Sequence, residues 1–284
     1  MALNVSNAFI TLFDSEVKQA YQGARTLAGL VREKSGIVGN TVRFQKIGKG
    51  QAQIRTPQTD VTPLNVTYSN VSATMTDYIS AEYTDIFHQA KVNFQERSEL
   101  VQVIGNSIGR RIDQILIDAI VAGSPGTTVA NTVAEDGSSG SASGLNLGKL
   151  RSAKKALDAK NVPAEGRTLL IHANSLSALL GSTTVTSSDF STVKSLSTGE
   201  LTQYLGMNIV TIGDRDEGGL AIDGSSDRPV YAFHRDSIGM GIGMNQTSRV
   251  DYIPEKTSFL CASYFSGGAV VVDNEGLVQI TTRE

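Results

Sequence analysis

The 284-residue sequence predicts an α+β protein, and three observations support this fold class. The stretch Asn93–Ala122 has the apolar spacing of one long amphipathic helix. Residues 41–86 alternate apolar and polar side chains over an unusual length, which is typical of β-strands. The C-terminal third holds several short strand-like runs without the regular alternation of strand and helix that predicts a doubly wound sheet.

The first expected element is an N-terminal helix over Asn7–Arg32, which carries a helical apolar stripe interrupted only by Gly23 and Gly29. Its aromatic and aliphatic face must dock on an apolar surface. The sequence leaves open whether that surface belongs to the same subunit or to a neighbour.

A long β ribbon is expected next, because the apolar period changes to two from Thr41 and a turn follows at Gly48–Gly50. The alternation resumes after Pro63 with Leu64, Val66 and Tyr68, and from Val71 to Tyr83 the apolar residues stand at odd positions. About twenty residues in this conformation reach roughly 65 Å, more than the diameter expected for the body, so part of the ribbon projects or bends. An isolated two-stranded ribbon is marginal in water. We therefore expect another subunit to complete it; the alternative is a hairpin folded onto its own sheet.

The helix Asn93–Ala122 is the element around which we expect the chain to be built. Asn93 and Glu96 resemble a capping box, and Gly123 with Pro125 supplies a stop. Its length of roughly 45 Å would cross the whole body. The apolar stripe consists of Val101, Ile104, Ile108, Ile112, Ile115 and Ala119.

The remaining elements follow from shorter patterns. Residues 123–144 are rich in Gly, Ser and Thr and predict a loop. After it we expect, in order, a helix at 145–159, a buried strand at 168–171, a short helix at 174–180, a polar stretch at 181–199, a strand ending at 212, a polar insertion at 214–228, and strands at 229–234, 238–243, 250–253, 259–265, 269–272 and 277–281.

Composition excludes several classes of protein. The formal net charge of -3 provides no basic surface for tight nucleic-acid binding. The single Cys261 excludes an intrachain disulfide and a cysteine-rich zinc site. No apolar run approaches the length of a membrane span, and the first residues lack the pattern of a signal peptide, so we expect no membrane association and no export.

The sequence predicts no catalytic residue, cofactor or metal site. His88, His172 and His234 show no ligand spacing, and no Gly-x-Ser-x-Gly elbow is present, so we interpret them as structural or solvated. The GMGIG run at Gly239–Gly243 lacks the following helix of a dinucleotide loop and fits glycines that allow close packing on a strand. Cys261 reads as a buried small apolar residue. Four acidic residues near one another suggest Ca²⁺, but a solvated loop is preferred because EF-hand spacing is absent: Asp214, Asp216, Glu217 and Asp223.

The order of these elements, together with four segments, resembles the HK97-like major capsid proteins of tailed bacteriophages over nearly the whole chain. The segments are LDAKNVPAEGRTLLIHANSLSALL (157–180), TGELTQYLGMNIV (198–210), VYAFHRDSIGMGIG (230–243) and SYFSGGAVVVDNEGLVQI (263–280). The resemblance implies an HK97-like fold divided into an N-terminal arm (1–40), an extended β-hairpin loop (41–90), a peripheral domain with the spine helix (91–144), an apical domain (145–245) and a return to the peripheral domain (246–284).

By resemblance the chain is expected to be a virion coat protein that self-assembles, as hexamers and pentamers, into an icosahedral shell around double-stranded DNA without binding it sequence-specifically. A separate scaffolding protein and a portal are implied partners, a decoration protein is a further one that the resemblance allows, and assembly is expected in the host bacterial cytoplasm. We expect noncovalent contact between subunits at the tip of the extended loop: Ile47, Gly48, Lys49, Gly50 and Gln51.

Two alternatives stay open at this point. An encapsulin-like nanocompartment shell protein has the same fold and encloses cargo enzymes instead of a genome. The third interpretation is a soluble α+β enzyme with a spatially assembled site. The long ribbon and the lack of a catalytic motif in the sequence both count against it.

Overall fold

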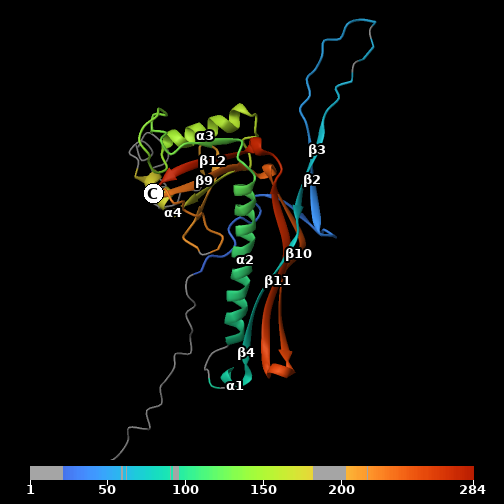
Figure 1. Cartoon of the computed structure of the whole chain (residues 1–284), viewed down its shortest axis with the longest axis vertical. Coiled ribbons are helices and arrows are strands. Elements are labelled where there is room, and N and C mark those ends of the chain that lie inside the picture. Colours follow the sequence, from blue (N-terminus) through green and yellow to red (C-terminus); the bar gives the residue numbers. More distant parts are fainter. Residues whose placement is uncertain are drawn as a thin grey trace, which may run out of the picture.

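The computed structural model describes residues 22–58, 60–61, 63–89, 91, 96–181, 203–215 and 217–284. A long helix lies beside a long, narrow sheet, and a second sheet covered by shorter helices lies across their upper end (Figure 1). A two-stranded ribbon continues beyond the body as a projecting loop. Within the described residues, no helix is both long and apolar enough to span a membrane.

The central helix α2 (Glu96–Ala122) confirms the predicted spine and ends at the predicted residue. Its buried stripe includes Ile104, Ile108, Ile112, Leu116 and Ile120. At its end the N–H of Gly123 donates to Ala119 O at 2.9 Å, and a Cβ on Gly123 would lie 2.3 Å from Val271 Cγ2. Close packing therefore requires glycine at this stop. The expected N-terminal cap Asn93 lies outside the described residues.

The long sheet has the order β1 (Arg32–Ser35), β10 (Ile238–Ile253), β11 (Ser258–Val271) and β4 (Thr76–Asp85). β1 pairs parallel to the start of β10, and the other pairs are antiparallel. The short 3-10 turn η2 (Pro254–Lys256) joins β10 to β11, and α1 (Ile86–Gln89) follows β4. α2 packs along β11 and β4. The expected strands at 238–243 and 250–253 are parts of one continuous strand.

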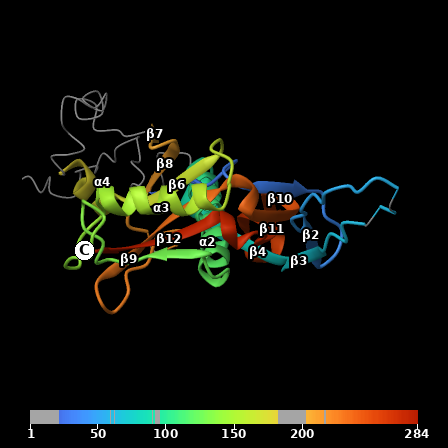
Figure 2. The same ribbon diagram turned by 90° about the horizontal axis from the view of Figure 1, so that it is seen from above.

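The second sheet has the order β5 (Thr127–Val129), β12 (Leu277–Arg283), β9 (Asp227–His234), β6 (Arg167–His172), β8 (Met207–Ile212) and β7 (Gln203–Tyr204). Helices α3 (Leu147–Ala159) and α4 (Ala173–Leu180) accompany it, and Figure 2 looks onto α3 with these strands alongside. The 3-10 turns η1 (Arg235–Ser237) and η3 (Asn274–Gly276) join the two sheets. In β6, Leu169 and Ile171 pack in the α3 cluster while Leu170 packs in the α2 cluster. Both faces of this sheet are therefore buried at its centre.

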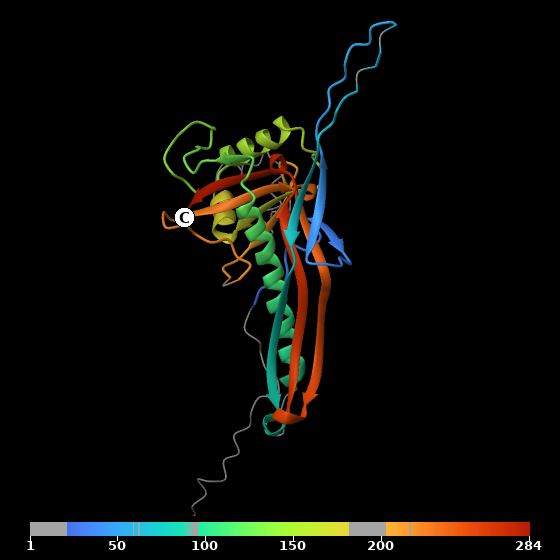
Figure 3. The same cartoon turned by 45° about the vertical axis from the view of Figure 1, so that its right-hand side comes forward.

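The ribbon consists of β2 (Thr41–Ile47) and β3 (Tyr68–Thr74), paired antiparallel from Thr41 opposite Thr74 to Ile47 opposite Tyr68. Met75 alone separates β3 from β4, so the predicted long strand pattern is real but changes its pairing partner there. In the projecting loop (48–67), the described residues 48–58, 60–61 and 63–67 carry no regular strand or helix, with a turn at Pro57 and Gln58 (Figure 3). Alternation at 64–67 therefore does not become a strand.

The described part of the expected N-terminal helix is not helical, and the prediction is wrong there. Residues 22–31 form loop and turn, and Arg32 begins β1; residues 1–21 lie outside the described residues. Leu27 and Val31 are buried against α2 and the sheets. Their helical spacing reflects this tertiary packing, because the N–H groups of Thr26 and Leu27 bond to the Asp113 side chain instead of to a preceding helical turn.

Candidate functional site

The ribbon rests on the body through a small apolar cluster of its own. Val42 and Phe44 from β2 pack with Ala73, Met75 and Val272, and this cluster is separate from the two main cores. The alternate residues of β2, at positions 41, 43, 45 and 47, point outward and are exposed. One face of the ribbon is therefore fixed to the body while the other is open.

Three glycines form the surface on which this face lies, which we call the glycine seat: Gly239, Gly241 and Gly268. A Cβ on Gly239 would lie 2.7 Å from the Phe44 ring, and one on Gly241 would lie 2.6 Å from Val42 Cγ1. A Cβ on Gly268 would lie 2.0 Å from Thr74 O, a backbone atom. The close-packing interpretation of GMGIG is confirmed, since the run lies within strand β10.

Two ion pairs tie the end of β2 to the η3 turn. Lys46 Nζ lies 2.8 Å from Asp273 Oδ1, and Lys49 Nζ lies 2.5 Å from Glu275 Oε2. The hydrogen bond from Lys49 lowers the pKa of Glu275, and the same bond raises the pKa of Lys49. Both pairs are solvent-exposed, so each contributes little to stability and is sensitive to salt.

The structure corrects the expected position of the loop tip. Ile47 is the last residue of β2, and Gly48–Gln51 begin the projecting loop, held near the body by the Lys49 ion pair. The outer turn of the loop is at Pro57 and Gln58. A Gly-rich sequence at 48–50 suggested a tight turn, but the glycines instead let the two sides of the loop approach: a Cβ on Gly50 would lie 2.3 Å from Leu64 Cδ2.

The projecting loop exposes apolar side chains. Ile54 is 97% exposed and Val61 is 86% exposed, and Leu64 is half exposed. Ile47 and Tyr68, at the ends of the ribbon, are also largely exposed. Apolar residues gathered on one exposed segment mark an interaction surface more often than isolated ones do.

The outer face of the long sheet adds a second exposed apolar surface. Ile79 and Tyr83 of β4 are 64% and 44% exposed, and they pair with Tyr264 and Leu260 of β11. The intervening residues face α2, where Arg111 lies over the Tyr78 ring and Ser80 contacts Ser107. Most apolar residues keep odd positions through both strands, but the buried face reverses at Met75, where β3 gives way to β4.

The two described imidazole side chains and the lone cysteine have structural positions. His172 is buried and its Nδ1 accepts from Asn174 N at the start of α4, while Nε2 lies 3.0 Å from Asp214 Oδ1. His234 Nδ1 accepts from Asp236 N in η1. Cys261 is buried in β11. The side chain of His88 lies outside the described part of the chain.

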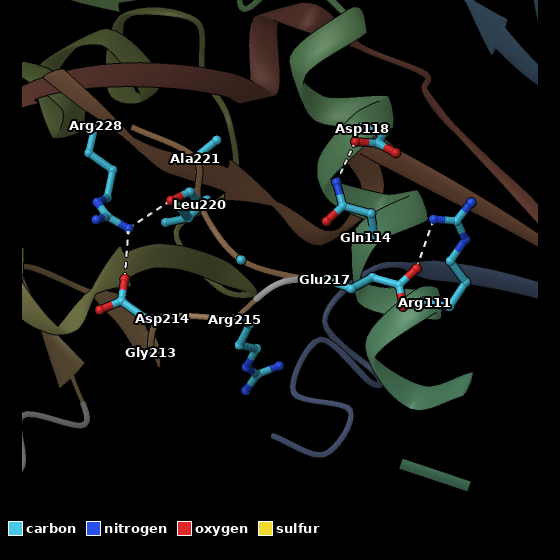
Figure 4. A pocket seen from close by; sticks show the side chains of 11 residues that line it. Arg111, Gln114, Asp118, Gly213, Asp214, Arg215, Glu217, Leu220, Ala221 and Arg228 are labelled. Atoms are coloured by element: carbon cyan, nitrogen blue, oxygen red, sulfur yellow. Dashed lines mark hydrogen bonds and ion pairs between the residues drawn. The ribbon is translucent and has the colours of Figure 1, made fainter. Parts of the chain in front are cut away.

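The acidic residues of the β8–β9 insertion (213–226) diverge to different partners. Asp214 faces His172 and Arg228, Glu217 pairs with Arg111 at 2.8 Å, and Asp223 accepts from the N–H groups of Ser225 and Asp227. Asp216 lies outside the described residues. A polar cavity of about 480 Å³ is lined by residues of this insertion and of α2 (Figure 4). Among the described residues, no group of three or more His, Cys, Asp or Glu side chains is arranged to hold a metal.

Comparison with known proteins shows which family and which solved structures this chain resembles. The family described as "Phage capsid protein" matches residues 5–284. The capsid structure of the cyanophage P-SCSP1u is 18% identical with a TM-score of 0.79, covering 100% of this chain and 96% of its own. A structure from Mycobacterium phage Che8 is 20% identical with a TM-score of 0.73, covering 98% of each chain.

The capsid of Ralstonia phage GP4 is 11% identical with a TM-score of 0.72, covering 100% of this chain and 97% of its own. No curated protein matches the sequence significantly. The family match and these neighbours favour a phage shell over a nanocompartment or a soluble enzyme. The chain therefore belongs to the phage capsid protein family, as a major capsid protein with the HK97-like α+β fold, a non-enzymatic structural protein that self-assembles into the shell of the virion.

Proposed function

We propose that the projecting loop makes the principal noncovalent contact between subunits, in hexamers and pentamers of an icosahedral shell around double-stranded DNA. The observation that supports this most directly is the exposure of Ile54 and Val61 on a segment that stands away from its own body. Their burial against a neighbour gains roughly 1.5–3 kcal/mol per fully covered side chain. Ile47–Gln51 take part as the base of this loop.

The shell is held by many modest contacts acting together. Once a subunit is held by one neighbour, its contacts with the others form at a high effective concentration. The stability of the shell therefore far exceeds that of one interface. The N-terminal arm (1–40) contacts a further subunit. In this proposal residues 91–144 and 246–284 are the peripheral domain and 145–245 the apical domain, although β5 and β12 complete the same sheet as the strands of 145–245.

The proposal includes partners and a place of assembly. A separate scaffolding protein guides curvature, a portal occupies one vertex, and a decoration protein is a further candidate for the outer surface. Assembly takes place in the host bacterial cytoplasm. The net charge of -3 suits an inner wall that confines DNA without binding it sequence-specifically.

The test replaces the two exposed apolar side chains of the loop in one variant, Ile54→Ser with Val61→Ser. The matched control is Val121→Ser, because Val121 is 59% exposed but lies in α2, outside both the loop and the arm. We expect the loop variant to fold normally by circular dichroism and to lose shell yield by roughly tenfold or more in electron micrographs. The control should assemble like the unchanged chain. Shells of normal yield and stability from the loop variant would refute the proposed contact.

A further inference from the structure

The carboxylate of Asp113 is fully buried in the middle of α2 and joins three segments of the chain. Its Oδ2 accepts hydrogen bonds from the backbone N–H and the hydroxyl of Thr26, both at 2.8 Å. Its Oδ1 accepts from the N–H of Leu27 at 3.1 Å. Arg215 of the β8–β9 insertion brings Nη1 within 3.3 Å of Oδ2. All four of these donors come from outside α2.

The neighbouring turn of α2 holds the preceding residues of the arm. Arg110 Nη1 donates to Gln22 Oε1 at 3.0 Å and to Gly23 O at 3.3 Å. At Gly109 an added Cβ would lie 3.1 Å from the backbone nitrogen of Arg25. One turn of the spine helix is therefore shaped to receive the arm backbone.

A single guanidinium nitrogen connects this site to the insertion. Arg215 Nη1 also donates to Ala24 O at 3.2 Å and to the Thr26 hydroxyl at 3.3 Å. The insertion is attached to α2 by two further contacts, from Arg111 to Glu217 and from the N–H of Gly218 to Gln114 Oε1, both at 2.8 Å. Figure 4 shows Arg215 and Glu217 beside α2 at the edge of the cavity.

We propose that Asp113 and Arg215 are positioning residues that fix where the N-terminal arm leaves the body and make that position depend on the β8–β9 insertion. A buried carboxylate that loses its donors pays the full desolvation cost, so the arm does not slide along α2 without losing several charge-assisted hydrogen bonds. Because Arg215 bonds to both segments, loosening the insertion loosens the arm. The consequence for assembly rests on the proposed function, in which the arm contacts a further subunit.

The test measures amide hydrogen exchange on the unassembled full chain, in peptides covering residues 22–31, the insertion and β6. The variants are Asp113→Asn, Arg215→Gln and the conservative Arg215→Lys. Asp118→Asn is the matched control, because Asp118 lies on the same helix but, within the described part of the chain, its carboxylate accepts a hydrogen bond from Gln114 alone. Shell yield is measured separately on the same variants.

Asp113→Asn should speed exchange in residues 22–31 by about tenfold and also speed it in the insertion, with β6 unchanged. Arg215→Gln should speed exchange in both segments, but less strongly than Asp113→Asn. Arg215→Lys should keep exchange in both segments close to that of the unchanged chain. The reason is that the three bonds of Arg215 to Ala24, Thr26 and Asp113 come from one nitrogen, which a lysine ammonium can replace. Unchanged exchange in residues 22–31 of a folded Asp113→Asn chain overturns the proposal, as does an arm that loosens without the insertion.

If Asp113→Asn also speeds exchange in β6, the chain has unfolded globally. The proposal is then tested with Arg215→Gln, by the exchange rates of residues 22–31 and of the insertion. Loosened arms together with normal shell yield would support the anchor and contradict the role of the arm in assembly. The two proposals therefore fail separately.

Discussion

Strand β6 has a continuous apolar run and the ribbon strand β2 has an alternating sequence, and their surroundings differ as much as their sequences. Every residue of β6 is buried, because α3 covers one face, α2 covers the other, and β8 and β9 pair with both edges. β2 has one paired edge, one packed face and a small separate apolar cluster. The single chain therefore encloses β6 completely, whereas it leaves one face of the ribbon and the projecting loop open.

Because of this difference, we expect substitutions in the two regions to affect different properties, folding stability in one and assembly in the other. Changes in the twice-covered sheet should lower the free energy of unfolding and leave the assembly of folded chains intact. Changes in the ribbon and loop should affect assembly more than unfolding. The predictions below test this division, from the largest expected effect on stability to the smallest.

Leu150→Ala should destabilise the chain most. Leu150 is fully buried between α3 and the second sheet, and truncating such a residue leaves a cavity that costs about 2–5 kcal/mol of unfolding free energy. Denaturant unfolding of the monomer measures this. At a temperature where the variant remains folded, shell yield should equal that of the unchanged chain; a strong assembly defect in that folded variant would contradict the division.

Gly268→Ala should affect both properties. The new methyl group would meet Thr74 O, a backbone atom that moves only if the ribbon moves, which costs about 1–3 kcal/mol and redirects the projecting loop. Denaturant unfolding and micrographs of the shells measure the two effects. Gly213→Ala is the control, because an added Cβ there meets nothing within 4 Å. Normal assembly of Gly268→Ala would show that the glycine seat does not orient the loop.

Lys149 provides a test of whether water is excluded from the interior around the second sheet. Its side chain is fully buried and donates to Gly144 O at 2.9 Å, and burial lowers its pKa from 10.5 to about 8. The unfolded chain therefore binds more protons between these pH values, so stability should rise with pH in this window, by roughly 1–3 kcal/mol. Unfolding titrations of the unchanged chain and Lys149→Met isolate this rise, which should be missing from the variant.

Much of the body was predictable because its signals are local. The spine helix carries a long apolar stripe and ends at Ala122 beside a stop at Gly123, and β6 is a short apolar run between turn residues. The order of elements was informative for the same reason. Each of these patterns is contained within the residues that form the element.

The errors arise where distant residues decide the local structure. Leu27 and Val31 have helical spacing, but Asp113, more than eighty residues away, takes the backbone N–H groups that a helix would use. The reversal of face at Met75 depends on the change of pairing from β2 to β11. The glycine at position 50 lies where the two sides of the projecting loop approach, beside Leu64, and no short-range pattern reveals that contact.

The exposed ion pair between Lys49 and Glu275 should have the smallest effect on stability and a visible effect on the loop. Glu275→Gln should leave thermal unfolding unchanged, because screened surface pairs contribute little. It should broaden the distribution of distances between spin labels placed at Ile54→Cys and Val38→Cys, both exposed in a chain whose only native cysteine is buried.

Acid should reproduce this broadening in the unchanged chain. The pKa of Glu275 lies below its ordinary value of 4.5 because Lys49 donates to it, so the tie is present above that range and is lost as pH falls through the lowered pKa. Glu275→Gln should show no such pH dependence. Distributions that stay narrow in both the variant and acid would mean that the glycine seat alone directs the loop, and the comparison between the closed body and the open ribbon would then rest on packing without electrostatics.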